Sequence, residues 1–225
     1  MSTLKIIDIS LFSLFSLFLL IGCVEQKKED KVAKDTIDST KVESDDVVSN
    51  QKLNKEEQIA AASFAAPTEV RDGAKIYGYD NDGNFITLRK GSNEMICIAD
   101  NPNKDGFEVV SYHNDLEPYM ARGRALKAEG KSFTERRDIR EKEATDHILA
   151  MPEKSATLHI LYGKNGYFDI DSAKVRNAKY RYVVYMPFAT QASTGLSLKP
   201  NAPGHPWLMF PGKANAHIMI TPPND

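Results

Sequence analysis

The sequence predicts an α+β protein, in which an antiparallel sheet of short strands and two or three helices form a single domain on a disordered stalk. Runs of alternating apolar side chains recur between turn residues, as short strands do. Helix start signals occur apart from these runs, two of them in succession in the middle of the chain. Without the leader and stalk, about 170 residues remain, which suits one core.

The first part of the domain contains a predicted helix and four predicted strands. Asn54 followed by Glu57 resembles a capping box, and the helix that it opens stops before Pro67. The first two strands flank a turn rich in Asp, Asn and Gly, a pattern that predicts a hairpin. The predicted strands are 74–79, 85–89, 94–98 and 107–112.

Two further helices are predicted next, followed by three strands. Asn114 with Glu117 resembles a second capping box and opens a helix that ends near Gly130. A third helix begins at Ser132 and runs towards Met151, because Pro152 stops it. The chain from 200 to 212 is rich in proline and glycine and is predicted to be a loop. The predicted strands are 156–162, 180–187 and 217–220.

The N-terminal 53 residues read as a leader and a spacer. Residues 9–22 carry no charge, and about 14 residues fall short of the roughly 20 that span a bilayer as a helix. Residues 1–22 therefore resemble a secretory signal peptide. Residues 23–53 mix both signs of charge without an aromatic side chain, so they are expected to be a disordered tether. The globular domain is predicted to occupy 54–225.

The leader ends in Leu20, Ile21, Gly22 and Cys23. This order resembles the lipobox of bacterial lipoproteins. The resemblance implies that the Cys23 thiol receives diacylglycerol, that the chain is cut before it, and that the new amino end is acylated by a chain such as palmitate. Two or three acyl chains hold a protein on a membrane. The expected location is the cell envelope, on the periplasmic side or the cell surface. The alternative is an ordinary cleaved signal with Cys23 near the cut by coincidence.

Composition limits the other partners. The net charge is −2 without a large basic excess, so nucleic acid is not an expected partner. Two cysteines occur in the chain. With Cys23 assigned to lipid, Cys97 has no partner for an internal disulfide, and it is predicted to be buried and inert.

One polar constellation could support chemistry: His113, His205 and His217, with Asp100 as a neighbouring carboxylate. Imidazoles from separate loops could bind zinc with an open position, or one could serve as a general base. The chain contains no helix with two histidines one turn apart, no paired-cysteine motif, no serine in a glycine elbow and no phosphate loop.

Four short motifs stand out in the folded part: AAP at 65–67, LRKGSN at 88–93 leading to Cys97, PWLM at 206–209 and AHIM at 216–219. With these motifs the folded part resembles an uncharacterised family of secreted bacterial proteins. The family has no established activity, so the resemblance implies none for this chain.

Three interpretations follow. The leading one is a non-enzymatic envelope lipoprotein that binds a ligand or partner at the Trp207 loop, since an aromatic ring in an adaptable loop suits a small ligand. The alternative for Trp207 is that its ring packs in the core. The second is a metal-assisted hydrolase that uses His205, His217 and His113. The third is a structural envelope protein that uses the charged helix at 136–143 as its contact.

Overall fold

A computed structural model describes residues 52–223 of the chain. The predicted leader, Cys23 and nearly all of the predicted tether lie outside these residues. Within the described range, no helix combines the length and the apolar composition needed to cross a bilayer.

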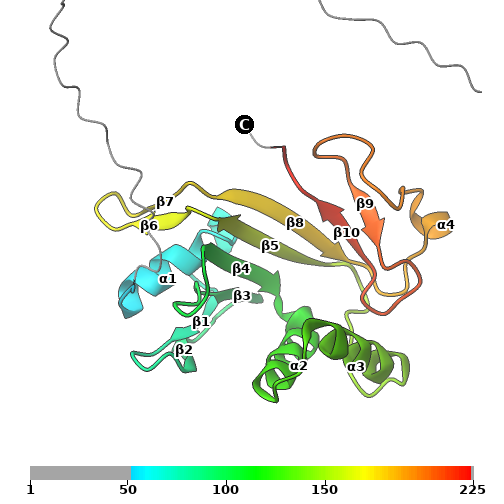
Figure 1. The fold of residues 1–225 in the computed structure, drawn as a ribbon, viewed down its shortest axis with the longest axis horizontal. Coiled ribbons are helices and arrows are strands. Elements are labelled where there is room, and N and C mark those ends of the chain that lie inside the picture. The colour runs from blue at the N-terminus through cyan, green and yellow to red at the C-terminus, as the bar shows by residue number, and fades with distance from the viewer. Residues whose placement is uncertain (1–51, 224–225) are drawn as a thin grey trace, which may run out of the picture. The chain divides into compact units, whose positions relative to one another are not determined.

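The described chain contains one large sheet, a separate hairpin and four α-helices (Figure 1). The sheet order is β2-β1-β3-β4-β5-β8-β10-β9, and β6 pairs with β7. Every neighbouring pair is antiparallel except β1 with β3, which is parallel. The predicted α+β class is confirmed. The elements are α1 (Lys55–Ser63), β1 (Lys75–Tyr79), β2 (Phe85–Arg89), β3 (Met95–Ile98), β4 (Phe107–His113), α2 (Glu117–Ala128), α3 (Phe133–Thr145), β5 (Ala156–Gly163), β6 (Tyr167–Asp169), β7 (Lys174–Arg176), β8 (Lys179–Tyr185), α4 (Gln191–Thr194), β9 (Trp207–Met209) and β10 (His217–Ile220).

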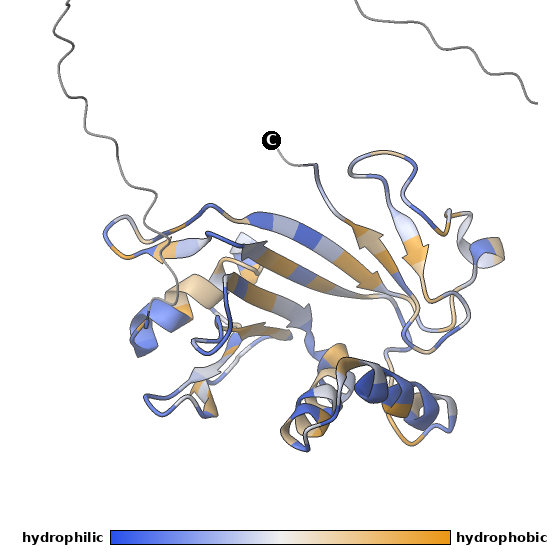
Figure 2. Cartoon of the chain, in the orientation of Figure 1, coloured by the Kyte–Doolittle hydropathy of each residue, from blue (hydrophilic) through white to orange (hydrophobic). Residues whose placement is uncertain are grey.

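Each face of the sheet is covered in part by a helix. Alternation along the strands turns Ile76, Cys97 and Val109 towards α1, where they pack with alanines of that helix. The opposite face packs against α2 and the turn before it through a second set of apolar side chains. We call these the α1 face and the α2 face. The set on the α2 face includes Ile96, Tyr112, Leu116, Met120, Leu158 and Val183. The centre of the sheet, at β4 and β5, is strongly hydrophobic (Figure 2).

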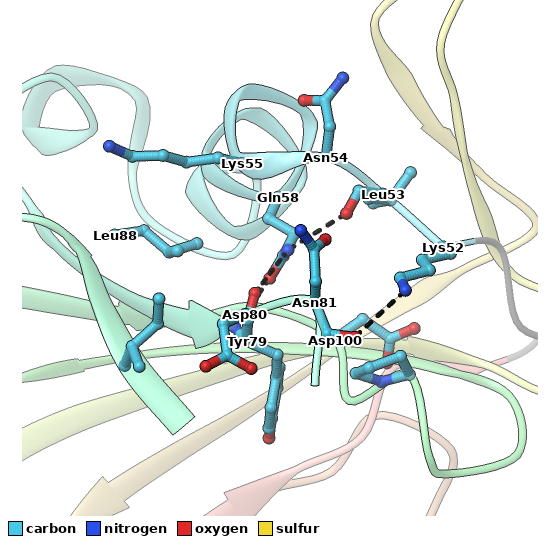
Figure 3. Close-up of a pocket in the computed structure, with 12 residues that line it drawn as sticks. Lys52, Leu53, Asn54, Lys55, Gln58, Tyr79, Asp80, Asn81, Leu88 and Asp100 are labelled. Carbon is cyan, nitrogen blue, oxygen red and sulfur yellow. Dashed lines mark hydrogen bonds between the residues drawn. The ribbon is translucent and has the colours of Figure 1, made fainter. Parts of the chain in front are cut away.

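The first helix is fixed to the sheet by Gln58. The predicted capping box is present, with Asn54 and Glu57 each accepting a backbone N–H of the other. One turn further, the Gln58 amide donates to the Tyr79 carbonyl (3.0 Å) and accepts from the Tyr79 N–H (2.9 Å), as Figure 3 shows. Gly78 lies beneath this amide, because a Cβ there would stand 2.6 Å from the Gln58 side-chain oxygen. The helix therefore approaches β1 closely.

Gln58→Ala should lower the free energy of unfolding by about 1–3 kcal/mol, because two partly buried backbone groups of Tyr79 lose their partner. Urea unfolding followed by circular dichroism measures the change. Gln191→Ala, in the exposed α4 helix, is the matched control and should stay within about 0.5 kcal/mol of the parent. Equal effects from the two substitutions would show that Gln58 does not hold α1 in place.

The second predicted capping box is wrong. Residues Asn114–Leu116 form a short 3-10 turn, and α2 begins at Glu117 without a side-chain cap. The physical reason is competition: the Glu117 carboxylate accepts hydrogen bonds from side chains of the sheet, so it cannot return to the backbone of Asn114. Ser132 and Glu135 do form the capping box predicted for the third helix.

The third helix ends at Thr145, and the prediction that it runs towards Met151 is wrong. His147 adopts a left-handed conformation (φ 57), and the Ile148 N–H returns to the Glu143 carbonyl. This geometry ends a helix. Figure 2 shows α3 as mostly hydrophilic, and part of its charge is used inside the molecule. Glu143 accepts two short bonds from Arg122 of α2 (2.9 and 2.8 Å).

Several small elements were not predicted. The hairpin β6–β7 covers part of the stretch between the predicted strands, and β9 lies inside the predicted loop at 200–212. Leu208 of β9 is fully buried in a small cluster with Ala189 and Ala216. The predicted proline-rich loop is therefore interrupted by an edge strand that has its own apolar anchor.

Candidate functional site

A large hollow lies between the α2–α3 hairpin and the open part of the α2 face. Its volume is about 930 Å³, within the range of about 300–1,000 Å³ that is usual for small-molecule sites. We call it the α2 groove. It is lined by Tyr79, Phe85, Ile98, Ala99, Asp100, Asn101, Lys104, Glu108, Val110, Arg124, Ala125, Lys127, Ala128, Phe133 and Arg136.

The floor of the α2 groove is built by four neighbouring strands. Tyr79 pairs with Phe85 across β1 and β2, and Ile98 pairs with Val110 across β3 and β4. Paired residues point to the same face of a sheet, so these side chains form one apolar surface. The Phe85 ring lies 5.7 Å from the Tyr79 ring and 5.0 Å from the Tyr77 ring.

A hydrogen-bonded network stands at the end of the floor nearest α2. Glu117 accepts from the hydroxyls of Tyr77 (3.0 Å) and Tyr112 (2.6 Å). Arg124 donates to Glu117 (2.6 Å) and to the Tyr112 hydroxyl (3.0 Å). Lys75 donates to the Tyr77 hydroxyl (2.6 Å). Burial is the main cause that raises the pKa of Tyr112, so its hydroxyl keeps the proton that it donates.

The network aims Arg124 along the floor. Its guanidinium carbon lies 5.3 Å from the ring centres of both Tyr77 and Phe85, a cation–π distance. Two of the five N–H donors of the guanidinium are used by Glu117 and Tyr112. The remaining donors can serve a ligand in the α2 groove.

A carboxyl group with a shifted pKa marks the opposite end of the floor. Burial raises the pKa of Asp100 to about 6, although its carboxylate accepts the Glu108 N–H at 2.9 Å. Glu108 is paired with Lys104 at 2.8 Å. Tyr79, whose pKa is also raised by burial and by the charge of Asp100, lies beside them. Perturbed groups in a hollow are typical of functional sites.

A smaller hollow of about 300 Å³ lies between the start of α1 and the β1–β2 hairpin. Figure 3 shows its residues, among them Lys52, Gln58 and Leu88. Lys52 donates to the Asn81 carbonyl at 3.2 Å across its mouth. Tyr79 and Asp100 line both this hollow and the α2 groove.

The three predicted candidate histidines lie in different surroundings. His113 ends β4, half-buried, and its Nδ1 accepts the Asp115 N–H at 3.3 Å. His217 of β10 is buried between the rings of Tyr185 and Phe210, and burial lowers its pKa. Within residues 52–223, no three His, Cys, Asp or Glu side chains are grouped so as to hold a metal ion. The zinc site therefore stays a prediction, and residues 52–223 contain no grouped set of ligands for it.

Trp207 and His205 do come together. Both line an open hollow of about 460 Å³ formed mainly by the Pro200–Gly204 segment and Thr221. Trp207 is partly buried, so it is neither a core residue nor a fully exposed ring. The predicted Trp207 loop therefore borders a surface hollow, and its role in binding stays a prediction.

Sequence reasoning missed the α2 groove. Tyr79, Phe85, Ile98 and Val110 each looked like an ordinary strand residue, and Arg124 like a helix surface residue. The available signal was the alternation in β1 and β2, which places Tyr77, Tyr79 and Phe85 on one face. What the alternation did not reveal was that no helix within residues 52–223 covers this part of that face.

Comparison with protein-family models, curated proteins and solved structures finds no match to this chain. The resemblance to a family of secreted bacterial proteins therefore stays a prediction. The fold and the hollows described above are the basis for a functional proposal.

Asp100→Asn should stabilise the protein at neutral pH. The pKa of Asp100 rises from 3.8 to about 6 on folding, so the folded state loses stability as pH rises through this window, by on the order of 1–3 kcal/mol. Asparagine keeps the oxygen that accepts the Glu108 N–H and removes the charge. Urea unfolding should show a gain at pH 8 that shrinks as pH falls towards 4.

The exposed neighbour supplies the control for this substitution. Asp105→Asn, in the same loop, should change the free energy of unfolding by less than about 0.5 kcal/mol at either pH. A gain for Asp100→Asn that is the same at pH 8 and pH 4 would contradict the assignment of the penalty to its charge.

Proposed function

We propose that this protein is a bacterial envelope lipoprotein, anchored through lipid on Cys23, whose domain binds a small ligand in the α2 groove. The observation that supports ligand binding is the groove itself. Its volume is within the range of known small-molecule sites, and its floor is apolar with charged groups at both ends. The observation that supports the anchor is the Leu20–Cys23 order after an uncharged run.

The Trp207 hollow is the second candidate place for a ligand, favoured because it unites an aromatic ring with an imidazole. A structural role for the charged helix is less favoured, because some of its charged groups already bond within the chain. Arg140 donates to the Tyr119 carbonyl and Glu141 accepts the Ala214 N–H. Neither role requires a metal.

Cys23→Ala should abolish incorporation of labelled palmitate and move the protein from the membrane fraction to the soluble fraction of its native host. The reason is that acyl chains on this thiol supply the membrane affinity, at about 0.8 kcal/mol per buried CH₂. Fractionation and mass spectrometry of the N-terminal peptide measure the outcome. Cys97→Ala removes the other cysteine and should keep both label and membrane location. Recovery of an unmodified Cys23 thiol from the parent would refute the anchor.

Filling the α2 groove should weaken ligand binding. The probe is Nile red, an uncharged apolar dye, added to the mature chain (residues 23–225) with Cys23→Ser so that no lipid is attached. Ala125→Trp and Ala128→Trp place a large ring in the groove, and each should weaken dye binding by at least about tenfold. Ala192→Trp, on the exposed α4 helix, is the matched control and should bind as the parent does.

Trp207 distinguishes the two candidate places, because it is the chain's single tryptophan. If the dye occupies the Trp207 hollow, it should quench Trp207 emission strongly, and Trp207→Phe should weaken its binding. If the affinity for the dye is unchanged in both groove variants but falls in Trp207→Phe, the proposed site moves to the Trp207 hollow.

A further inference from the structure

The charges of the α2 groove are unevenly distributed. Four cationic and two acidic side chains line it. Lys104 is paired with Glu108 at the sheet end. The helix side contributes Arg124, Lys127 and Arg136, and within residues 52–223 neither Lys127 nor Arg136 forms an ion pair. The wall formed by α2 and α3 is therefore cationic.

The remaining acidic residue of the groove, Asp100, does little to offset the positive charge of this wall. Asp100 is the groove acid without an ion-pair partner in the described range. It lies at the far end of the floor, beside Tyr79 and Glu108. The end of the groove nearest α2 and α3 therefore has the more positive electrostatic potential, and this potential attracts an anion.

Arg124 gives the anion a defined position. Glu117 and Tyr112 hold its guanidinium over the Phe85 ring, where the apolar floor begins. A guanidinium kept in one orientation loses little freedom when it binds a carboxylate, and its fork of N–H groups matches the two carboxylate oxygens. The Glu117 carboxylate is shared among Arg124 and two tyrosine hydroxyls, and Lys75 adds a further positive charge beside it. The cluster stays net positive.

From this arrangement we infer that the ligand is a fatty acid, with its carboxylate at Arg124, Lys127 and Arg136 and its acyl chain on the floor of Tyr79, Phe85, Ile98 and Val110. This inference rests on the proposed function of the α2 groove and names its ligand class. Charge complementarity selects an anionic head, and the unbroken apolar floor selects a hydrocarbon body over a polar one. The exposed Phe133 ring at the helix rim adds apolar surface over the chain.

The test is isothermal titration of the mature chain, with Cys23→Ser, against laurate and against dodecylamine, which has the same chain length and the opposite charge. Laurate should bind at least about tenfold more tightly. Decanoate, two methylenes shorter, should bind about 15-fold more weakly than laurate, since each buried methylene contributes about fourfold. The double variant Lys127→Gln/Arg136→Gln should remove the preference for laurate.

A matched variant separates a local effect from a change of net charge. Arg137→Gln/Lys142→Gln removes the same charge from α3 at positions that do not line the α2 groove, and it should bind laurate as the parent does. Equal binding of laurate and dodecylamine, or equal effects of the two double variants, would overturn the fatty-acid inference. Nile red binding that is still lost in Ala125→Trp and Ala128→Trp would then leave the groove as a ligand site of another class. Absence of laurate binding would also overturn the inference.

Discussion

The carboxylate of Glu117 joins the second helix to the sheet, and the α2 groove depends on that junction. Two tyrosines from different strands and one arginine two turns further along α2 all donate to it. Hydrogen bonds to a charged group contribute about 1.5–3 kcal/mol each. One side chain therefore sets both the distance of α2 from the strands and the direction of Arg124. A helix placed elsewhere on the same strands would leave the floor without a wall.

Local signals in the sequence were enough to predict much of the fold. The capping boxes at Asn54 and Ser132 were correct because each involves residues three apart and no distant partner competes for them. The box at Asn114 failed because Tyr77, 40 residues away from Glu117, takes part in the bonding. The parallel pairing of β1 with β3 and the strand β9 depend on contacts that a local pattern does not contain.

The candidate site was predictable only where its residues are close in sequence. His205 and Trp207 share a hollow because two positions separate them in one loop. His113 and His217 belong to strands β4 and β10, which β5 and β8 separate, so composition alone could not show whether they meet. The α2 groove was not found because Phe85 and Val110 become parts of one surface only through the register of four strands. Which part of the sheet the described helices leave uncovered is likewise a property of the assembled structure.

Cys97 lies fully buried in the cluster beneath α1, and burial raises the pKa of its thiol to about 12. The thiolate, which is the reactive species in disulfide exchange, is therefore almost unpopulated at physiological pH. In the oxidising surroundings outside the cytoplasm, an accessible single thiol would cross-link chains or trap oxidoreductases as mixed disulfides. At the envelope location that we propose, burial beneath α1 would keep the Cys97 sulfur from such reactions.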